Sequence, residues 1–531
     1  MPMQDLDTRT AGIPNKSLEF AGDYHLPYVH LINHIGEGKD PSTHGEDISA
    51  LIVEFNLYES IFNSSVTGSM VIVDTQNLIA KLPIQGTERV SFKISTKLEN
   101  DFDDTVINCT ESNGTAMHVY AVTDKKQNES DNVLSYTIHF ASREFVRNLR
   151  TKVSESFNGR MDQMVNKIFS DPEYLDSQKT LHYQQTRNQD KIVIPNLTPF
   201  DAIGLMCRRS LPEIYRSKGA GYLFYETTKG FHFRSWESLC VDKNGTPRHA
   251  EQQFRYVQAN VDQRVGRHPD GHDMDRITET YKNVRDYKFT NNFHDVAINT
   301  QLGTYGHRVI THNIYNKSYK TDDYHYHNSW NSTNHLEDFP SIVESPVDYD
   351  VKEGTPYQKG VSDYPESRVS LQSTSQYTHG EPTGNFGTPI EDDGILEGAR
   401  NAQINKVRQG TKLEMTVNGQ SRLQAGDLID FDLQSVENRE TSGGRLDPQY
   451  SGRYIITDIR HRIANDMFLQ VLTCVKDSSK SGFGYSGNKS FTEISGGTGK
   501  HNARSKDIND KDDTPVIETQ IPKTGWYPGA S

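Results

Sequence analysis

The sequence predicts a β-rich α+β fold: two related antiparallel β-barrels, the second split by an insertion, together with a small helical α/β unit. Three observations lead to this prediction. Short runs in which apolar and polar residues alternate recur over residues 47–142 and again over residues 412–478. Between these regions, over residues 143–215, the apolar spacing becomes helical. Gly, Asn and Asp separate the alternating runs, as expected of tight turns.

The first barrel is predicted from alternations in the N-terminal quarter of the chain. Residues 28–32 form an apolar island in an otherwise polar N-terminal segment. Strands are then expected at residues 51–58, 68–74, 90–95, 117–123 and 136–140. Short strands at this spacing, joined by polar turns, are typical of a small antiparallel barrel.

The helical unit is predicted from helix-start signals and from helical spacing. Ser142 is expected to cap a helix that carries Phe145, Leu149 and Val153, and residues 161–168 continue at helical spacing. A further helix is expected to begin with Thr198 at the N-cap position and proline at the first helical position.

The second barrel is predicted to begin with a hairpin of residues 222–226 and 230–235. An insertion then interrupts it, with short strands expected at 278–287 and 293–299. A helix at 395–407 leads back into the barrel.

In the resumed part, Asn418-Gly419 is expected to form a hairpin turn, and Gly426-Asp427 a turn before a strand. Two strands follow, the first ending at His461 and the second beginning at Met467.

These signals divide the chain into five parts. They are an N-terminal segment with the first barrel (1–142), the helical α/β unit (143–215), the second barrel (216–255 and 405–478), an inserted domain with a His/Tyr-rich loop (256–404) and an extended or disordered C-terminal arm (479–531).

Composition excludes several classes of protein. The 57 basic and 71 acidic residues give a net charge of −14, which argues against a protein that wraps nucleic acid or coats an anionic membrane. An 18-residue apolar run and a basic N-terminal region are both missing, so neither a membrane span nor a secretory signal is expected. Four scattered cysteines are expected to be reduced core residues: Cys109, Cys207, Cys240 and Cys474.

Candidate metal ligands occur in two histidine-rich places. His325 and His327 would project from the same face of a strand, with His335, Asp322 and Asp323 nearby. A second group consists of His268, His272, Asp270, Asp273 and Asp275. Because 20 histidines in a His/Tyr/Asn-rich chain will cluster somewhere, we predict no metal site and no other cofactor.

No catalytic residue is predicted either. The chain has no P-loop, no G-x-S-x-G and no H-E-x-x-H motif. Asp427 is interpreted as a turn residue that bonds local backbone N–H groups, and His461 as a packed or capping histidine. The other acids lie in solvated runs, which argues against the paired carboxylates of a glycoside hydrolase.

Three passages together resemble the central baseplate hub proteins of contractile-tailed (T-even-like) bacteriophages and, more distantly, the base of type VI secretion spikes. The first is T-G-S-M-V-I-V-D followed by L-P-I-Q-G-T-E-R-V, at residues 67–74 and 82–90. The second is P-N-L-T-P-F-D-A-I at 195–203. The third is the final region, with A-G-D-L-I at 425–429 and S-G-R-Y-I-I-T-D-I-R-H at 451–461.

The resemblance implies a structural, non-enzymatic protein of the virion tail baseplate, assembled in the host cytoplasm. It implies a homotrimer whose six barrels form a ring that joins the six-fold tail tube to the three-fold central spike. The implied partners are the spike, the tail tube and tube-initiator proteins and the baseplate wedge proteins. DNA would pass through the channel without specific binding, with a neutral or acidic wall and with Arg143, Arg147 and Arg150 on outer or interface surfaces.

Two alternatives from other classes remain. One is a tail-associated enzyme that cleaves peptidoglycan or another glycan, which would show a cleft with a perturbed carboxylate. The other is a host-binding tail adhesin, which would show sequence repeats and an elongated stalk.

Overall fold

The computed structural model describes most of the chain between residues 21 and 480. The described residues are 21–33, 45–75, 84–96, 106–128, 133–187, 189–214, 219–256, 280–313, 317–343, 346–352, 355–374, 379–380, 393–435 and 446–480. The predicted C-terminal arm beyond Lys480 and the second histidine group, at residues 268–275, lie outside them.

The main sheet is built from strands at both ends of the chain. Its N-terminal strands are β1 (Val29–Ile32), β2 (Gly45–Asp47), β3 (Ile52–Ser60), β4 (Thr67–Asp74), β5 (Arg89–Ile94), β6 (Ile107–Cys109), β7 (Met117–Asn128) and β8 (Val133–Ala141). Its later strands are β14 (Gln252–Arg255), β15 (Val284–Asn291), β23 (Thr411–Asn418), β24 (Leu428–Asp432), β25 (Gly452–Ala464) and β26 (Met467–Lys476). The strands run in the order β15-β23-β26-β25-β3-β4-β8-β7-β5-β1-β2, with β24 joined to β25, β14 to β24 and β6 to β5.

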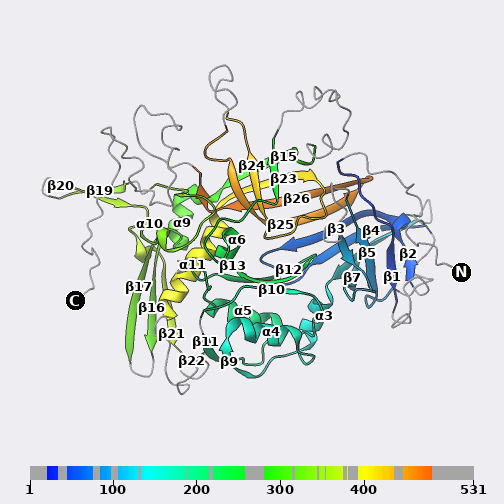
Figure 1. The fold of residues 1–531 in the computed structure, drawn as a ribbon, viewed down its shortest axis with the longest axis horizontal. Coiled ribbons are helices and arrows are strands. Elements are labelled where there is room, and N and C mark those ends of the chain that lie inside the picture. Colours follow the sequence, from blue (N-terminus) through cyan, green and yellow to red (C-terminus); the bar gives the residue numbers. More distant parts are fainter. Residues whose placement is uncertain are drawn as a thin grey trace.

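The two halves of this sheet meet at one strand pair, β3 with β25, which Figure 1 shows crossing the upper part of the molecule. The pairing is antiparallel and places His461 opposite Leu57 and Ile463 opposite Phe55. Arg460 and Arg462 both bind the carboxylate of Glu54 across the pair, at 2.9 and 3.1 Å. Hydrogen bonds between residues some 400 positions apart therefore hold the halves together.

Each half of the sheet has its own hydrophobic core. In the N-terminal half, the rings of Phe55, Phe92 and Phe140 pack with centroids 4.9 to 6.1 Å apart. In the C-terminal half, a separate cluster forms around Phe431 and Tyr454. The prediction of a β-rich α+β fold is thus confirmed. The finer division into two barrels is not confirmed, because the described strands of the main sheet follow a single path in which no closed barrel is found.

The helical unit lies below the main sheet in Figure 1. Its helices are α3 (Arg143–Arg150), α4 (Met161–Ser170), α5 (Pro199–Arg209) and the short α6 (Trp236–Cys240). Its strands are β9 (Ser156–Arg160), β10 (Leu181–Tyr183), β11 (Gln189–Val193), β12 (Tyr222–Thr227) and β13 (Gly230–Ser235). The predicted cap of α5 is confirmed, because the Thr198 hydroxyl accepts a hydrogen bond from the Asp201 N–H.

The inserted region forms small sheets and short helices around an aromatic core. Its elements are α9 (Val296–Leu302), β16 (Gly306–Asn313), β17 (Ser318–His325), α10 (Tyr326–Ser329), β18 (Phe339–Pro340), β19 (Pro346–Lys352), β20 (Thr355–Gly360), β21 (Val369–Thr374) and β22 (His379–Gly380), with the 3-10 turns η5 (Asn292–His294), η6 (Trp330–Ser332) and η7 (Pro365–Ser367). Outside this region, the 3-10 turn η3 (Ser49–Leu51) precedes β3, and β27 (Ser478–Ser479) follows β26 and pairs with β18. The sheet of β17, β16 and β21 extends at the lower left of Figure 1, beside α11 (Asp393–Gln409). The helix predicted at 395–407 is thus confirmed.

Four local predictions are wrong. The Ser142 side chain makes no hydrogen bond that caps α3, and this helix ends at Arg150, before Val153. Residues 293–299, predicted as a strand, form a 3-10 turn and α9, because Asp295 caps a helix through the Ile298 N–H. The strand predicted through His325 and His327 stops at His325, and His327 lies in α10. Asn418-Gly419 does not make a hairpin to the next strand, since β23 pairs with β26 and β15 instead.

The four cysteines are buried and free, as the sequence predicts. Among the described helices, none has the length and apolar character needed to cross a membrane.

Gly452, at the start of β25, gives the first testable prediction. Its φ of +124° is rarely adopted by L-residues, and an added Cβ would lie 2.7 Å from the carboxylate of Glu337 and 3.0 Å from Nζ of Lys476. That carboxylate accepts the Arg453 N–H at 3.0 Å. We expect Gly452→Val to lower the free energy of unfolding by about 2–3 kcal/mol in urea denaturation.

Gly114→Val is the matched control, because Gly114 also has a positive φ but its Cβ would meet no atom within 4 Å. An equal loss in both variants would contradict a role for the Glu337 contact.

Candidate functional site

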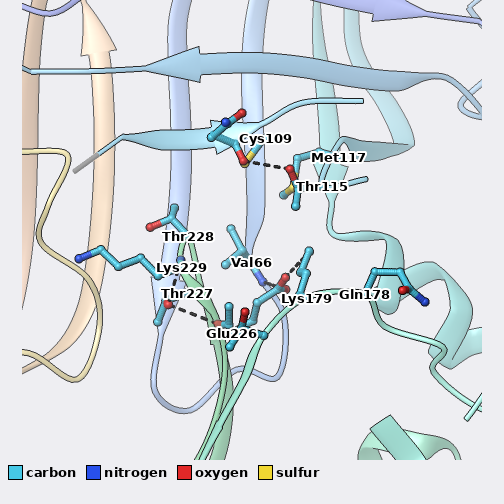
Figure 2. A pocket seen from close by; sticks show the side chains of 13 residues that line it. Val66, Cys109, Thr115, Met117, Gln178, Lys179, Glu226, Thr227, Thr228 and Lys229 are labelled. Carbon is cyan, nitrogen blue, oxygen red and sulfur yellow. Dashed lines mark hydrogen bonds and ion pairs between the residues drawn. The ribbon is translucent and has the colours of Figure 1, made fainter. Parts of the chain in front are cut away.

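A pocket of about 210 Å³ lies where the N-terminal half of the sheet meets the helical unit. Figure 2 shows Cys109, Thr115 and Met117 on one side and Lys179 and Glu226 on the other. The lower side is formed by the turn between β12 and β13 and by the segment before β10. The backbone approaches closely there, since a Cβ on Gly230 would lie 2.5 Å from the Thr180 carbonyl oxygen.

Lys179 is the centre of a buried charge network in this pocket. Its ammonium lies 3.0 Å from a carboxylate oxygen of Glu144 and 2.5 Å from one of Glu226. The exposed fractions of the three side chains are 11% for the lysine and 2% for each glutamate. Glu226 also accepts the Val66 N–H at 2.8 Å, and Glu144 accepts the Ser177 hydroxyl at 2.6 Å. Lys179 thus links α3 to β12, and Glu226 links β12 to the residue that precedes β4.

The three charged groups in this network shift one another's pKa. Burial would lower the pKa of Lys179, but the two carboxylates outweigh it and raise that pKa. Burial would raise the pKa of Glu144, yet Lys179 and Ser177 lower it. Burial raises the pKa of Glu226, and the charge of Glu144 adds to that effect. Lys179 is therefore held protonated between two acids that compete for it.

A second buried carboxylate, Glu59 on β3, lies at the junction of three parts of the chain. It accepts the Thr228 N–H at 3.1 Å and the Ala425 N–H at 2.9 Å. Nε2 of His461, on β25, lies 3.4 Å from the same carboxylate, and both side chains are fully buried. Burial would raise the pKa of Glu59, but the histidine and the two backbone donors lower it. Glu59 thereby connects β3, the β12–β13 turn and the C-terminal strands.

This arrangement supports positioning better than nucleophilic chemistry. A nucleophilic lysine needs a lowered pKa, whereas the pKa of Lys179 is raised. Burial raises the pKa of the Cys109 thiol to about 12, so the thiolate nucleophile is scarce at neutral pH. Within the described residues, no group of three or more His, Cys, Asp or Glu side chains is placed to hold a metal ion.

The structure separates the first histidine group and gives its ring nitrogens protein partners. His327 contacts the Ser362 hydroxyl at 2.8 Å and the Ile342 carbonyl at 2.9 Å. His325 contacts the Asp363 carboxylate at 3.1 Å. The expected shared face does not form because the strand ends between the two histidines.

The other members of that group are also engaged. His335 contacts Asp477 at 3.0 Å and the Trp330 carbonyl at 3.0 Å, and its ring stacks on the Trp330 ring at 3.5 Å. Asp323 pairs with Arg308 at 2.7 Å. Of these contacts, the one between His335 and Asp477 joins the inserted region to the segment that follows β26.

Asp427 and His461 have the packed positions that the sequence predicts, with two differences. The Asp427 carboxylate accepts the Gln424 N–H at 3.0 Å, as expected of a turn residue, but the side chain is buried and burial raises its pKa to about 6. His461 does not end its strand, because β25 continues to Ala464. Its ring stacks on Phe468, and Nδ1 contacts the Gln470 amide at 3.1 Å.

The raised pKa of Asp427 gives a pH-dependent prediction. A buried acid whose pKa rises from 3.8 to about 6 on folding contributes stability below pH 3.8 that is lost as the pH rises through 6. Asn cannot ionise and keeps an acceptor for Gln424. We therefore expect the stability of wild type relative to Asp427→Asn to fall by up to about 3 kcal/mol over that range in urea denaturation.

Asp430→Asn, on a side chain of β24 that is 45% exposed, is the matched control. If the free energies of unfolding of wild type and Asp427→Asn differ by the same amount at every pH, the predicted effect of burial on Asp427 is wrong.

The sequence reasoning missed the buried charges at this junction, although a signal for two of them exists. Glu59 continues the inward stripe of Phe55 and Leu57, and Glu226 follows Phe224 at the same spacing. An acid at an inward position of a strand is unusual, and it indicates a buried partner. Lys179 and Glu144 carry no such local signal.

No family model matches this chain, and no curated protein matches it. Similarity appears among solved structures. A tail protein from Neisseria meningitidis MC58 aligns with 86% of this chain and 97% of its own, at 7% identity and a TM-score of 0.43. The 43 kDa tail protein of prophage MuSo2 from Shewanella oneidensis aligns with 85% of this chain and 99% of its own, at 10% identity and a TM-score of 0.43.

A component of the E. coli type VI secretion system, described as similar in structure to tail proteins of bacteriophage T4, aligns with 80% of this chain and 74% of its own. The identity is 9% and the TM-score 0.36. These three solved structures are described as tail or secretion-system proteins.

Proposed function

We propose that this protein is a structural subunit of a phage tail baseplate. In this role it acts as a central hub, forming a trimeric ring that joins the six-fold tail tube to the three-fold spike and lets DNA pass. The observation that carries the proposal is the pairing of β3 with β25, which joins two strand-rich halves with separate cores edge to edge in one chain. Two such halves in each of three copies supply the six units that a six-fold tube requires.

The ends of the sheet support association with further copies. Within the described residues, β2 pairs only with β1; at the other end, β15 pairs with β23, and the residues just before β15 bond to Arg255 of β14. Exposed strand edges readily pair with another chain. In the assembled baseplate, the proposed neighbours are the central spike, the tail tube and tube-initiator proteins and the wedge proteins.

The buried charge network at the junction supports a structural role, because it holds parts of the chain in a fixed relative position. Lys179 and Glu59 fix the helical unit and the C-terminal strands to the N-terminal sheet through buried bonds. Buried charge pairs of this kind hold one geometry, because each partner is costly to leave alone.

The test is the mass of the purified full-length protein in solution. We expect light scattering to give three times the chain mass of 60.2 kDa for the protein alone, or that mass plus the mass of the bound spike protein after a spike is added. A stable monomer at high concentration, with and without the spike, would overturn the trimeric ring.

The same sample tests the proposed channel. With a net charge of −14, the wall should not retain phosphates, so duplex DNA at low salt should bind weakly or not at all. Tight, salt-sensitive binding would instead identify a DNA-handling protein. Arg143 and Arg147 already bind Asp176 and the Tyr174 carbonyl, which supports their assignment away from the DNA path.

A tail-associated glycan-cleaving enzyme is the second candidate, and one observation favours it. Asp427 is a carboxyl with a raised pKa that lines a cavity together with Glu251. Its carboxylate, however, is bonded to the turn that it closes. Hydrolysis of cell-wall glycan that is lost in Asp427→Asn, while the trimer remains, would support the enzyme over the hub.

A further inference from the structure

A second, larger cavity of about 570 Å³ lies beside the Lys179 pocket and shares Thr228 and Lys229 with it. Its other walls come from β13, from the segment after α6 and from the turn before β24. Permanently charged basic side chains slightly outnumber acidic ones around it: Lys229, Arg234 and Arg248 against Glu251 and Asp427, with His182 and His232 also in the lining.

The two arginines lack an anionic partner. Arg234 is half-buried on β13, and its guanidinium makes no hydrogen bond or ion pair with any residue that the structure describes. The guanidinium of Arg248 reaches only the Leu239 carbonyl, at 3.5 Å, among those residues. The guanidiniums are close enough that, after burial, the charge of Arg248 helps to lower the pKa of Arg234. Two cations in one cavity repel each other unless an anion lies between them.

The acids in the cavity make no hydrogen bond or ion pair with the two arginines, although Asp427 interacts with both of them electrostatically through space. The carboxylate of Asp427 accepts the Gln424 N–H, and burial raises its pKa to about 6. Glu251 is exposed and forms no ion pair within the described part of the chain. The cavity therefore presents guanidinium donors that no carboxylate of the described fold uses.

Neutral donors line the same wall. The Thr228 hydroxyl is buried and has no hydrogen-bond partner among the described residues. His232, which is 5% exposed, uses Nε2 on the Thr227 hydroxyl at 3.1 Å, while its Nδ1 is without a partner in the described structure. Buried polar atoms are normally satisfied, so unsatisfied ones beside a cavity indicate a bound group.

We propose that this cavity binds a phosphate-type oxyanion between the guanidiniums of Arg234 and Arg248. Planar guanidiniums donate paired hydrogen bonds to such oxygens, and these charge-assisted bonds are strong in a partly enclosed site. The Thr228 hydroxyl supplies a further donor. The phosphate group could come from a free ion or from a nucleic-acid backbone, and the proposal is independent of the tail role.

The experiment follows thermal unfolding of the full-length protein during titration with inorganic phosphate, with sodium chloride adjusted to hold the ionic strength constant. We expect a saturable rise in Tm, since a ligand that binds only the folded state stabilises it. Arg234→Gln and Arg248→Gln should each weaken the apparent affinity about tenfold or more. Arg208→Gln, on an exposed residue of α5 outside the cavity, should leave it unchanged.

Two further measurements complete the test. Glu251→Gln should tighten phosphate binding, which tests the site even if an arginine variant does not fold. A short DNA duplex in place of phosphate identifies the source: a shift lost in Arg234→Gln would assign the site to nucleic acid, and no shift would assign it to the free ion. A Tm that does not respond to phosphate, or an equal response in Arg234→Gln and Arg208→Gln, would overturn the proposal.

Discussion

Replacing Lys179 by methionine is expected to lower the free energy of unfolding by about 3–5 kcal/mol, the cost of breaking a buried ion pair from one side. Methionine keeps an unbranched apolar chain near the Phe231 ring, where the lysine ammonium lies 5.7 Å from the centroid. It leaves the carboxylates of Glu144 and Glu226 buried together without a counter-charge. Urea denaturation followed by circular dichroism measures the loss.

Lys167→Met is the matched control, because Lys167 forms a 2.6 Å pair with Glu155 at the surface, where the two side chains are 47% and 38% exposed. A surface pair contributes less than about 1 kcal/mol. Adding Glu226→Gln to Lys179→Met should recover part of the stability, since glutamine keeps an acceptor for the Val66 N–H. Equal losses in Lys179→Met and Lys167→Met would show that the buried network does not stabilise the fold.

Asp477→Ala is expected to have an effect of similar size, about 3–5 kcal/mol, at the junction between the inserted region and β26. The Asp477 carboxylate contacts His335 at 3.0 Å and accepts the Leu336 N–H at 3.2 Å. Its charge also favours the ammonium of Lys406, whose pKa is lowered by burial and which lies over the Tyr326 ring at 5.6 Å. Alanine removes all three interactions, and urea denaturation at neutral pH measures the loss.

The pH dependence shows whether the loss of stability comes from the missing charge of Asp477 or from poorer packing. Burial would raise the pKa of Asp477, but His335 lowers it to about 2 from 3.8. The stability that it contributes is therefore present above pH 3.8 and lost as the pH falls through 2. The gap between wild type and Asp477→Asn should close over that range. Asp430→Ala, at an exposed pair with Arg453, should cost less than about 1 kcal/mol.

Much of the secondary structure could be predicted because it depends on local patterns. Strands β3, β4, β5, β7 and β8 lie where the sequence alternates apolar and polar residues, and β4 buries every second residue, so the spacing is visible without any partner. The start of α5 was visible as well, because Thr198, the following proline and Asp201 satisfy the helix N-terminus among themselves. The turn at Asp427 is another case in which donor and acceptor are three residues apart.

Other elements could not be predicted because their partners are distant in the sequence. The pattern of β23 does not indicate that it pairs with β26 and β15 and not with the strand that follows it. Val53 is exposed although Phe55 and Leu57, at the same alternating spacing, are buried, because a bulge between Ile52 and Glu54 shifts the register. His325 and His327 looked like a ligand pair only while the strand was assumed to continue.

By itself, the sequence determined that the chain is β-rich with a helical unit between two strand-rich regions, that its cysteines lie in the core, and that Asp427 closes a turn. The tertiary structure alone decided that those regions join through β3 and β25, and that Lys179 and Glu59 are buried at the junction. The reason is physical. Periodicity reports which side of an element is apolar, whereas strand pairing and the burial of charge depend on partners that only the folded chain brings within bonding distance.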